Sequence, residues 1–63
     1  MKNLKQALIE AAEHYERRAH RYLERAEQDK IGQKQGLMEA HKYSLGMAKA
    51  MREALEYVEE FLG

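Results

Sequence analysis

The segment DKIGQKQG, residues 29–36, decides the fold, because it interrupts a chain that otherwise reads as helix. It holds two of the four glycines, and the 63 residues contain no proline. Gly32 can adopt the left-handed backbone conformation that closes a helix C-terminus. The sequence therefore predicts an all-α fold, with a helix over residues 2–29, a turn over residues 30–35 and a helix over residues 36–62. One alternative stays open: Asp29 can act as an N-cap, which would begin the second helix several residues earlier.

The helix before the turn carries one narrow apolar stripe, whose members recur with alternating spacings of four and three, typical of a heptad seam. Flanking apolar positions are Leu4, Ala11 and Leu23, while charged residues occupy the other side. This Leu8 stripe consists of Leu8, Ala12, Tyr15, Ala19, Tyr22 and Ala26.

The helix after the turn carries two such stripes. The Leu37 stripe consists of Leu37, His41, Ser44, Ala48, Met51, Leu55, Val58 and Leu62, and the Tyr43 stripe of Ala40, Tyr43, Met47, Ala50, Ala54, Tyr57 and Phe61. The first helix is narrow and can cover only one of the two stripes. The other stripe must be covered by a second copy of the chain or by a different protein. We therefore expect an antiparallel two-helix hairpin that dimerises into a four-helix bundle. The expected self-association interface consists of Tyr43, Met47, Met51, Ala54, Leu55, Tyr57, Val58, Phe61 and Leu62.

The order of the charges also favours an antiparallel pair. Around a turn near Gly32, facing residue numbers sum to about 64 to 66, because both helices rise equally per residue. This register predicts opposite charges side by side: Glu10 and Glu13 with Arg52 and Lys49, Arg25 with Glu39, and Lys2 and Lys5 with Glu59 and Glu60. Exposed pairs contribute about 0.2 to 1 kcal/mol each, so they select the register more than they stabilise it.

Side-chain size is the second sign of close packing. Tyr15 and Tyr22 are expected opposite a run of small residues that includes Ser44, Gly46, Ala48 and Ala50. A glycine inside a helix costs about 1 kcal/mol relative to alanine, so Gly46 is expected either to allow close packing or to mark a bend.

The composition requires a partner and limits what that partner is. A chain of 63 residues buries little apolar surface, and without cysteine it has neither disulfides nor thiolate zinc sites, which leaves oligomerisation as the route to stability. Eleven basic and eleven acidic residues cancel, so no global charge attracts nucleic acid. No apolar run is long enough to span a membrane, and we expect a cytoplasmic protein.

Catalysis, cofactors and metal ions are not expected. The sequence has no Gly-rich phosphate loop, nucleophile elbow or Cys/His pair. His14 and His20 lie off the stripes and are expected on the solvated surface, whereas His41 is expected to fix the helix register or to lie near the turn end. The Glu10-x-x-Glu13 and Glu53-x-x-Glu56-x-x-Glu59 patterns project away from the stripes and are interpreted as a solvated acidic face.

One dense basic patch provides an alternative function. Four arginines lie close together on the first helix and are candidate phosphate contacts: Arg17, Arg18, Arg21 and Arg25. Interleaved Glu13, Glu16 and Glu24 weaken this case, because mixed charges usually form a solvated face.

The expected architecture resembles that of the Rop-type plasmid regulators, in which a two-helix hairpin dimerises into a four-helix bundle and binds paired RNA loops. The resemblance covers architecture and length, with no shared motif. The leading hypothesis is therefore a non-enzymatic, self-associating helical module, a small regulator or adaptor that binds another protein. The alternative is a dimeric regulator that binds RNA or DNA through the arginine-rich face.

Overall fold

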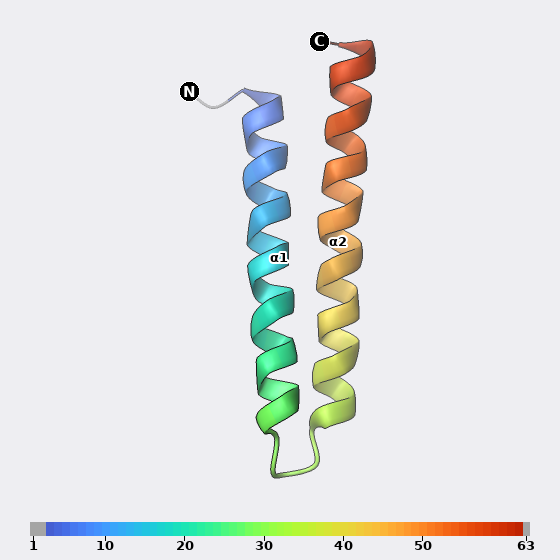
Figure 1. Ribbon diagram of the computed structural model, residues 1–63. Helices are drawn as coiled ribbons and strands as arrows, with labels where there is room; N and C mark the ends of the chain where they lie inside the picture. The colour runs from blue at the N-terminus through green and yellow to red at the C-terminus, as the bar shows by residue number, and fades with distance from the viewer. Residues whose placement is uncertain (1–2, 63) are drawn as a thin grey trace.

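The computed structural model describes residues 3–62 and shows two antiparallel helices packed side by side (Figure 1). Helix α1 spans Leu4–Gln28 and helix α2 spans Lys34–Phe61. The hairpin measures 47 × 20 × 11 Å, with both ends of the chain at one end of the rod and the turn at the other. The prediction of an all-helical two-helix fold is confirmed; position 2, included in the predicted first helix, lies outside the described residues.

Polar side chains mark both ends of α1. Asn3 caps α1, because its side-chain oxygen accepts a hydrogen bond from the backbone N–H of Gln6 at 2.8 Å. At the other end of α1, Asp29 is the C-cap, and its carboxylate accepts hydrogen bonds from the backbone N–H groups of Ile31 and Gln33 at 3.3 and 2.7 Å. Asp29 therefore shapes the turn and does not begin the second helix, whose N-cap is Gln33 without a side-chain cap.

Gly32 has the expected left-handed backbone, with φ of 83°. Its place differs from the prediction, because α1 ends at an extended Asp29 and Gly32 lies three residues further along. The glycine reverses the chain within the loop and does not close the helix. Helix α2 then begins at Lys34, two residues before the predicted start.

The centre of the hairpin is made of small side chains. Ala12, Ala19 and Ala26, spaced by seven on α1, are buried, as are Ser44 and Ala48 on α2. Among the described residues no large side chain is fully buried. Small residues allow two helix backbones to approach closely, but they contribute little apolar area.

The Leu37 stripe is the one that faces α1. Its members Ser44 and Ala48 are buried, and Met51, Leu55 and Val58 on the same stripe are half-buried. Tyr15 and Tyr22 are also half-buried. Of the two roles expected for Gly46, close packing against α1 is not seen: this residue is exposed, and a Cβ atom there would meet nothing within 4 Å.

His41 joins the two helices by a hydrogen bond. Its ring Nδ1 lies 2.7 Å from the backbone carbonyl oxygen of Ala19, and the side chain is half-buried. The carbonyl is an acceptor, so Nδ1 carries the hydrogen and donates it. A ring can reach this carbonyl because alanine leaves the helix surface open. This contact agrees with the prediction that His41 fixes the register.

An ion pair also joins the helices, at a different level from the one predicted. Arg52 donates from Nε and Nη2 to the two carboxylate oxygens of Glu16, at 3.0 and 2.8 Å. The bidentate hydrogen bond lowers the pKa of Glu16 and raises the pKa of Arg52. The register prediction placed Arg52 opposite Glu10, which lies about 9 Å along α1 from Glu16, so this charge pair was predicted wrongly.

The remaining predicted charge pairs do not form where they can be described. Over residues 3–62, no ion pair joins Glu13 to Lys49, Arg25 to Glu39, or Lys5 to Glu59 or Glu60. Lys2 lies outside the described residues. The register is therefore held by the alanine contacts, His41 and the Glu16–Arg52 pair.

We predict opposite effects of alanine at two glycines. Gly46→Ala should stabilise the protein by about 1 kcal/mol, because α2 gains helix propensity in open space. Gly32→Ala should destabilise it by about 1 to 2 kcal/mol, because the left-handed backbone penalises a Cβ atom. Urea unfolding followed by circular dichroism measures both. A destabilised Gly46→Ala variant would contradict the placement of this glycine outside the helix contact.

The Glu16–Arg52 pair should make stability depend on pH. A carboxylate whose pKa is lowered by folding stabilises the protein fully above its ordinary value of 4.5, and this stabilisation is lost as the pH falls through the lowered pKa. Glu16→Gln should therefore lower the thermal midpoint at pH 7 but leave it unchanged at strongly acidic pH. Glu53→Gln, which removes one charge without breaking an ion pair, is the control. Equal shifts for both variants would show that the pair contributes nothing specific.

Candidate functional site

An exposed apolar face runs along α2 beside the contact with α1. Tyr43, Tyr57 and Phe61 are 68%, 63% and 61% exposed, although all three belong to the apolar Tyr43 stripe. Met47 and Ala54, between them on the stripe, are half-buried. In a single hairpin this row of large side chains contacts water. Contiguous exposed apolar patches commonly mark interaction sites.

The residues of the expected interface fall on two sides of α2. Met51, Leu55 and Val58 lie on the stripe that packs against α1, and Leu62 follows the end of α2 with 75% exposure. The other five belong to the Tyr43 stripe: Tyr43, Met47, Ala54, Tyr57 and Phe61. We call the side of α2 that carries the whole Tyr43 stripe the outer face. The sequence defined both stripes but did not show which one α1 covers.

The outer face has a groove near the turn and a pair of rings near the chain ends. The groove, of about 570 Å³, lies between Tyr15 and Tyr22 on α1 and Gly36, Ala40 and Tyr43 on α2. Gly36, which has no side chain, and Ala40 make the α2 side of the groove shallow, and the charged residues Arg18 and Glu39 also line it, together with Ser44. At the opposite end of α2, the rings of Tyr57 and Phe61 contact each other, with centroids 4.4 Å apart and planes inclined by 36°.

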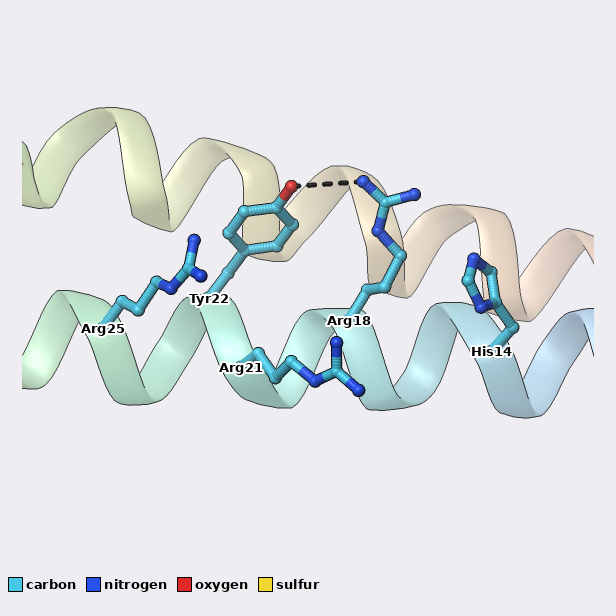
Figure 2. A pocket seen from close by; sticks show the side chains of 5 residues that line it. All are labelled: His14, Arg18, Arg21, Tyr22 and Arg25. Atoms are coloured by element: carbon cyan, nitrogen blue, oxygen red, sulfur yellow. Dashed lines mark hydrogen bonds between the residues drawn. The ribbon is translucent and has the colours of Figure 1, made fainter.

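A second groove, of about 360 Å³, is lined by three arginines and a histidine of α1 (Figure 2). His14, Arg18, Arg21 and Arg25 are spaced by four, three and four, so they form one stripe about 16 Å long on the helix. Tyr22 also lines this groove, and its hydroxyl accepts a hydrogen bond from Arg18 Nη2 at 3.3 Å. This bond raises the pKa of Arg18 and orients its guanidinium toward α2. We call these four residues the cationic stripe.

Two of the acids interleaved with the arginines are paired with other residues. Glu16 is bound by Arg52 and Glu24 by His20. Arg17 lines a neighbouring groove with Glu13, Glu16, His20 and Arg21, so Arg21 lies at the border between the cationic stripe and these acids. Over residues 3–62, neither Arg21 nor Arg25 forms an ion pair or hydrogen bond, so their charges are free to meet an anion.

Other groups considered as ligands lie on the surface. His14 contacts the edge of the Tyr15 ring, and His20 pairs with Glu24, as noted above. Within residues 3–62, no group of three or more His, Asp or Glu side chains is arranged to hold a metal ion. Neither α1 nor α2 contains an apolar stretch long enough to cross a membrane.

The outer face and the cationic stripe are thus the two surfaces from which a function can be inferred. They lie next to each other, because Arg18 and Tyr22 line both grooves. In comparisons with known proteins, no family model, no curated protein and no solved structure matches this chain.

Proposed function

We propose that the protein is a non-enzymatic, self-associating helical module that acts as a small regulator or adaptor through protein–protein interaction. The observation that supports it is the outer face, where three aromatic side chains of one stripe are more than 60% exposed. Two hairpins packed through these faces would form a four-helix bundle.

The total exposed surface supports the same proposal. A compact monomer of 7.4 kDa exposes about 4,200 Å². This hairpin exposes 5081 Å², which is about 900 Å² more. In a protein interface of standard size each partner buries about 800 Å². The excess surface therefore equals what one hairpin would bury in a dimer.

Energetics couple folding to association in this proposal. Buried alanines at the centre of the hairpin contribute little, whereas each large apolar side chain contributes about 1.5 to 3 kcal/mol when buried. Small domains are stable by only about 5 to 15 kcal/mol in total. Burying Tyr43, Met47, Tyr57 and Phe61 in a dimer would therefore supply a large part of the stability.

A bundle formed through the outer faces leaves another surface of each hairpin exposed, and a target protein could bind there. On the side of the hairpin opposite the outer face, Leu45 is 46% exposed beside the Glu16–Arg52 pair. Apolar and charged groups together are typical of non-obligate protein interfaces. This side is where we expect an adaptor to bind its target.

The proposal predicts that folding depends on concentration. Sedimentation should show a dimer or larger species at micromolar concentration, and the thermal midpoint should rise with protein concentration by mass action. Met47→Asp places a charge on the outer face and should break the dimer, which lowers the molecular mass measured by sedimentation. Because folding is coupled to association, the helicity should fall as well. Met51→Asp should disrupt the contact with α1 directly and lower helicity at every concentration.

Lys42→Asp is the control for these two substitutions, because Lys42 is exposed and belongs to neither stripe of α2. A fully helical monomer whose thermal midpoint does not change with concentration would refute the proposed function.

A second function is favoured by the cationic stripe, namely the binding of nucleic acid phosphates by a dimer. Its support is that Arg18, Arg21 and Arg25 line one groove, and that two of the interleaved acids, Glu16 and Glu24, are paired with other residues. Arginine side chains bind phosphates well because their donors match two phosphate oxygens. The zero net charge of the chain opposes this function, so affinity would depend on the stripe alone.

A binding experiment with matched variants tests this second function. Structured RNA and duplex DNA are titrated at two salt concentrations, because phosphate contacts make affinity fall steeply as salt rises. Arg18→Glu combined with Arg21→Glu should abolish binding and preserve helicity. Arg17→Glu combined with Lys49→Glu makes the same change in charge outside the stripe and should reduce binding much less. Absence of binding by the unmodified protein at low salt would exclude this function.

A further inference from the structure

Side-chain size alternates in pairs along the outer face. With Gly36 added one turn before Ala40, the stripe begins with two small residues, Gly36 and Ala40, followed by two large ones, Tyr43 and Met47. The same order then repeats, and the full set is Gly36, Ala40, Tyr43, Met47, Ala50, Ala54, Tyr57 and Phe61. Every member recurs by four or three, so all lie on one side of α2.

From this alternation we infer that a second copy of the chain packs antiparallel on the outer face, with Tyr57 and Phe61 of each copy inserted into the groove of the other. The inference rests on the proposed self-association and adds its geometry. Placing the two-fold axis between Ala48 and Lys49 pairs a large residue with a small one at each level: Phe61 with Gly36, Tyr57 with Ala40, Tyr43 with Ala54, and Met47 with Ala50.

The structure already contains both halves of this contact. The groove over Gly36 and Ala40 has a volume of about 570 Å³, and a Cβ atom at Gly36 would meet nothing within 4 Å. The Tyr57–Phe61 ring pair is exposed at the other end of the same stripe. A two-fold interface requires that if one residue contacts another, the reverse contact also exists. Antiparallel packing meets this requirement, because it brings each ring pair to the partner's groove.

The parallel arrangement of hairpins fits the side chains less well. Both turns would then lie at the same end, and α1 of one copy would lie over α2 of the other. Leu4 begins α1 and Phe61 ends α2, at the same end of the antiparallel hairpin, so large side chains would meet there, and Tyr22 would meet Tyr43 near the turn. Large residues that meet at the same level force side chains out of their preferred rotamers. A parallel dimer would also leave the groove over Gly36 and Ala40 without an aromatic occupant.

A distance measured between the two turns tests the arrangement. The chain has no cysteine, and Ile31 is 77% exposed in the turn, so Ile31→Cys carries one nitroxide label without disturbing either face. Pulsed electron spin resonance on the intact dimer should give a separation close to the 47 Å length of the hairpin, because antiparallel packing puts the turns at opposite ends. A separation below about half this length would show parallel packing and overturn the inference.

The same experiment distinguishes the inference from the proposed function. If sedimentation shows only monomer and no dipolar coupling is detected, self-association itself fails. If a dimer forms with the turns close together, self-association stands and only the antiparallel geometry fails.

Two glycine substitutions test the occupancy of the groove. Gly36→Leu fills the groove without a clash inside the hairpin, so the dimer dissociation constant should rise about tenfold or more. Gly46→Leu is the matched control: this glycine is also helical and open, but belongs to neither stripe, and the dissociation constant should not change. Equal dimerisation of the two variants would show that no side chain of the partner occupies the groove.

Discussion

The contact between small side chains at the centre of the hairpin is the constraint on which the other features depend. Ala12, Ala19 and Ala26 leave no side-chain bulk between α1 and the buried Ser44 and Ala48. A close contact of this kind lets His41 reach the Ala19 carbonyl, which longer side chains would cover. It also buries little apolar area, because alanine has only a methyl group to bury. Large apolar residues, such as Tyr43, Tyr57 and Phe61, remain exposed on the outer face.

The sequence predicted the elements of this fold better than their contacts. The composition and the 29–36 interruption were sufficient for two helices and a turn, because helix propensity and the position of glycines are local properties. The pairing of charges was not local. Arg52 binds Glu16 and not Glu10, six residues earlier, so a register counted from the turn is too coarse to predict ion pairs. The role of Gly32 was misplaced for a similar reason: the Asp29 carboxylate ends α1 before the glycine is reached.

For the candidate sites, the sequence defined the residues but not their environment. The spacing identified two stripes on α2, yet only the burial of Ser44 and Ala48 shows which stripe α1 covers. The arginine patch was considered weak because acids are interleaved with it in the sequence. Helical periodicity alone would have separated them, since residues 14, 18, 21 and 25 share one side of a helix and residues 13, 16 and 24 do not. The groove beside Gly36 depends on how the two helices are placed relative to each other, which no local pattern contains.

The arrangement of hairpins in a dimer connects the two candidate functions. Arg18 lies at the border between the outer face and the cationic stripe, so the stripe runs along the edge of any bundle formed through the outer face. In an antiparallel bundle α1 lies over α1 of the second copy, and both cationic stripes border the same side. In a parallel bundle α1 lies over α2, and the two stripes lie on opposite sides. Only the antiparallel arrangement therefore joins eight basic side chains, four from each stripe, into one surface. Because phosphate affinity grows with the number of cations that one strand can contact, the packing of the outer face also determines how strongly the dimer could bind a nucleic acid.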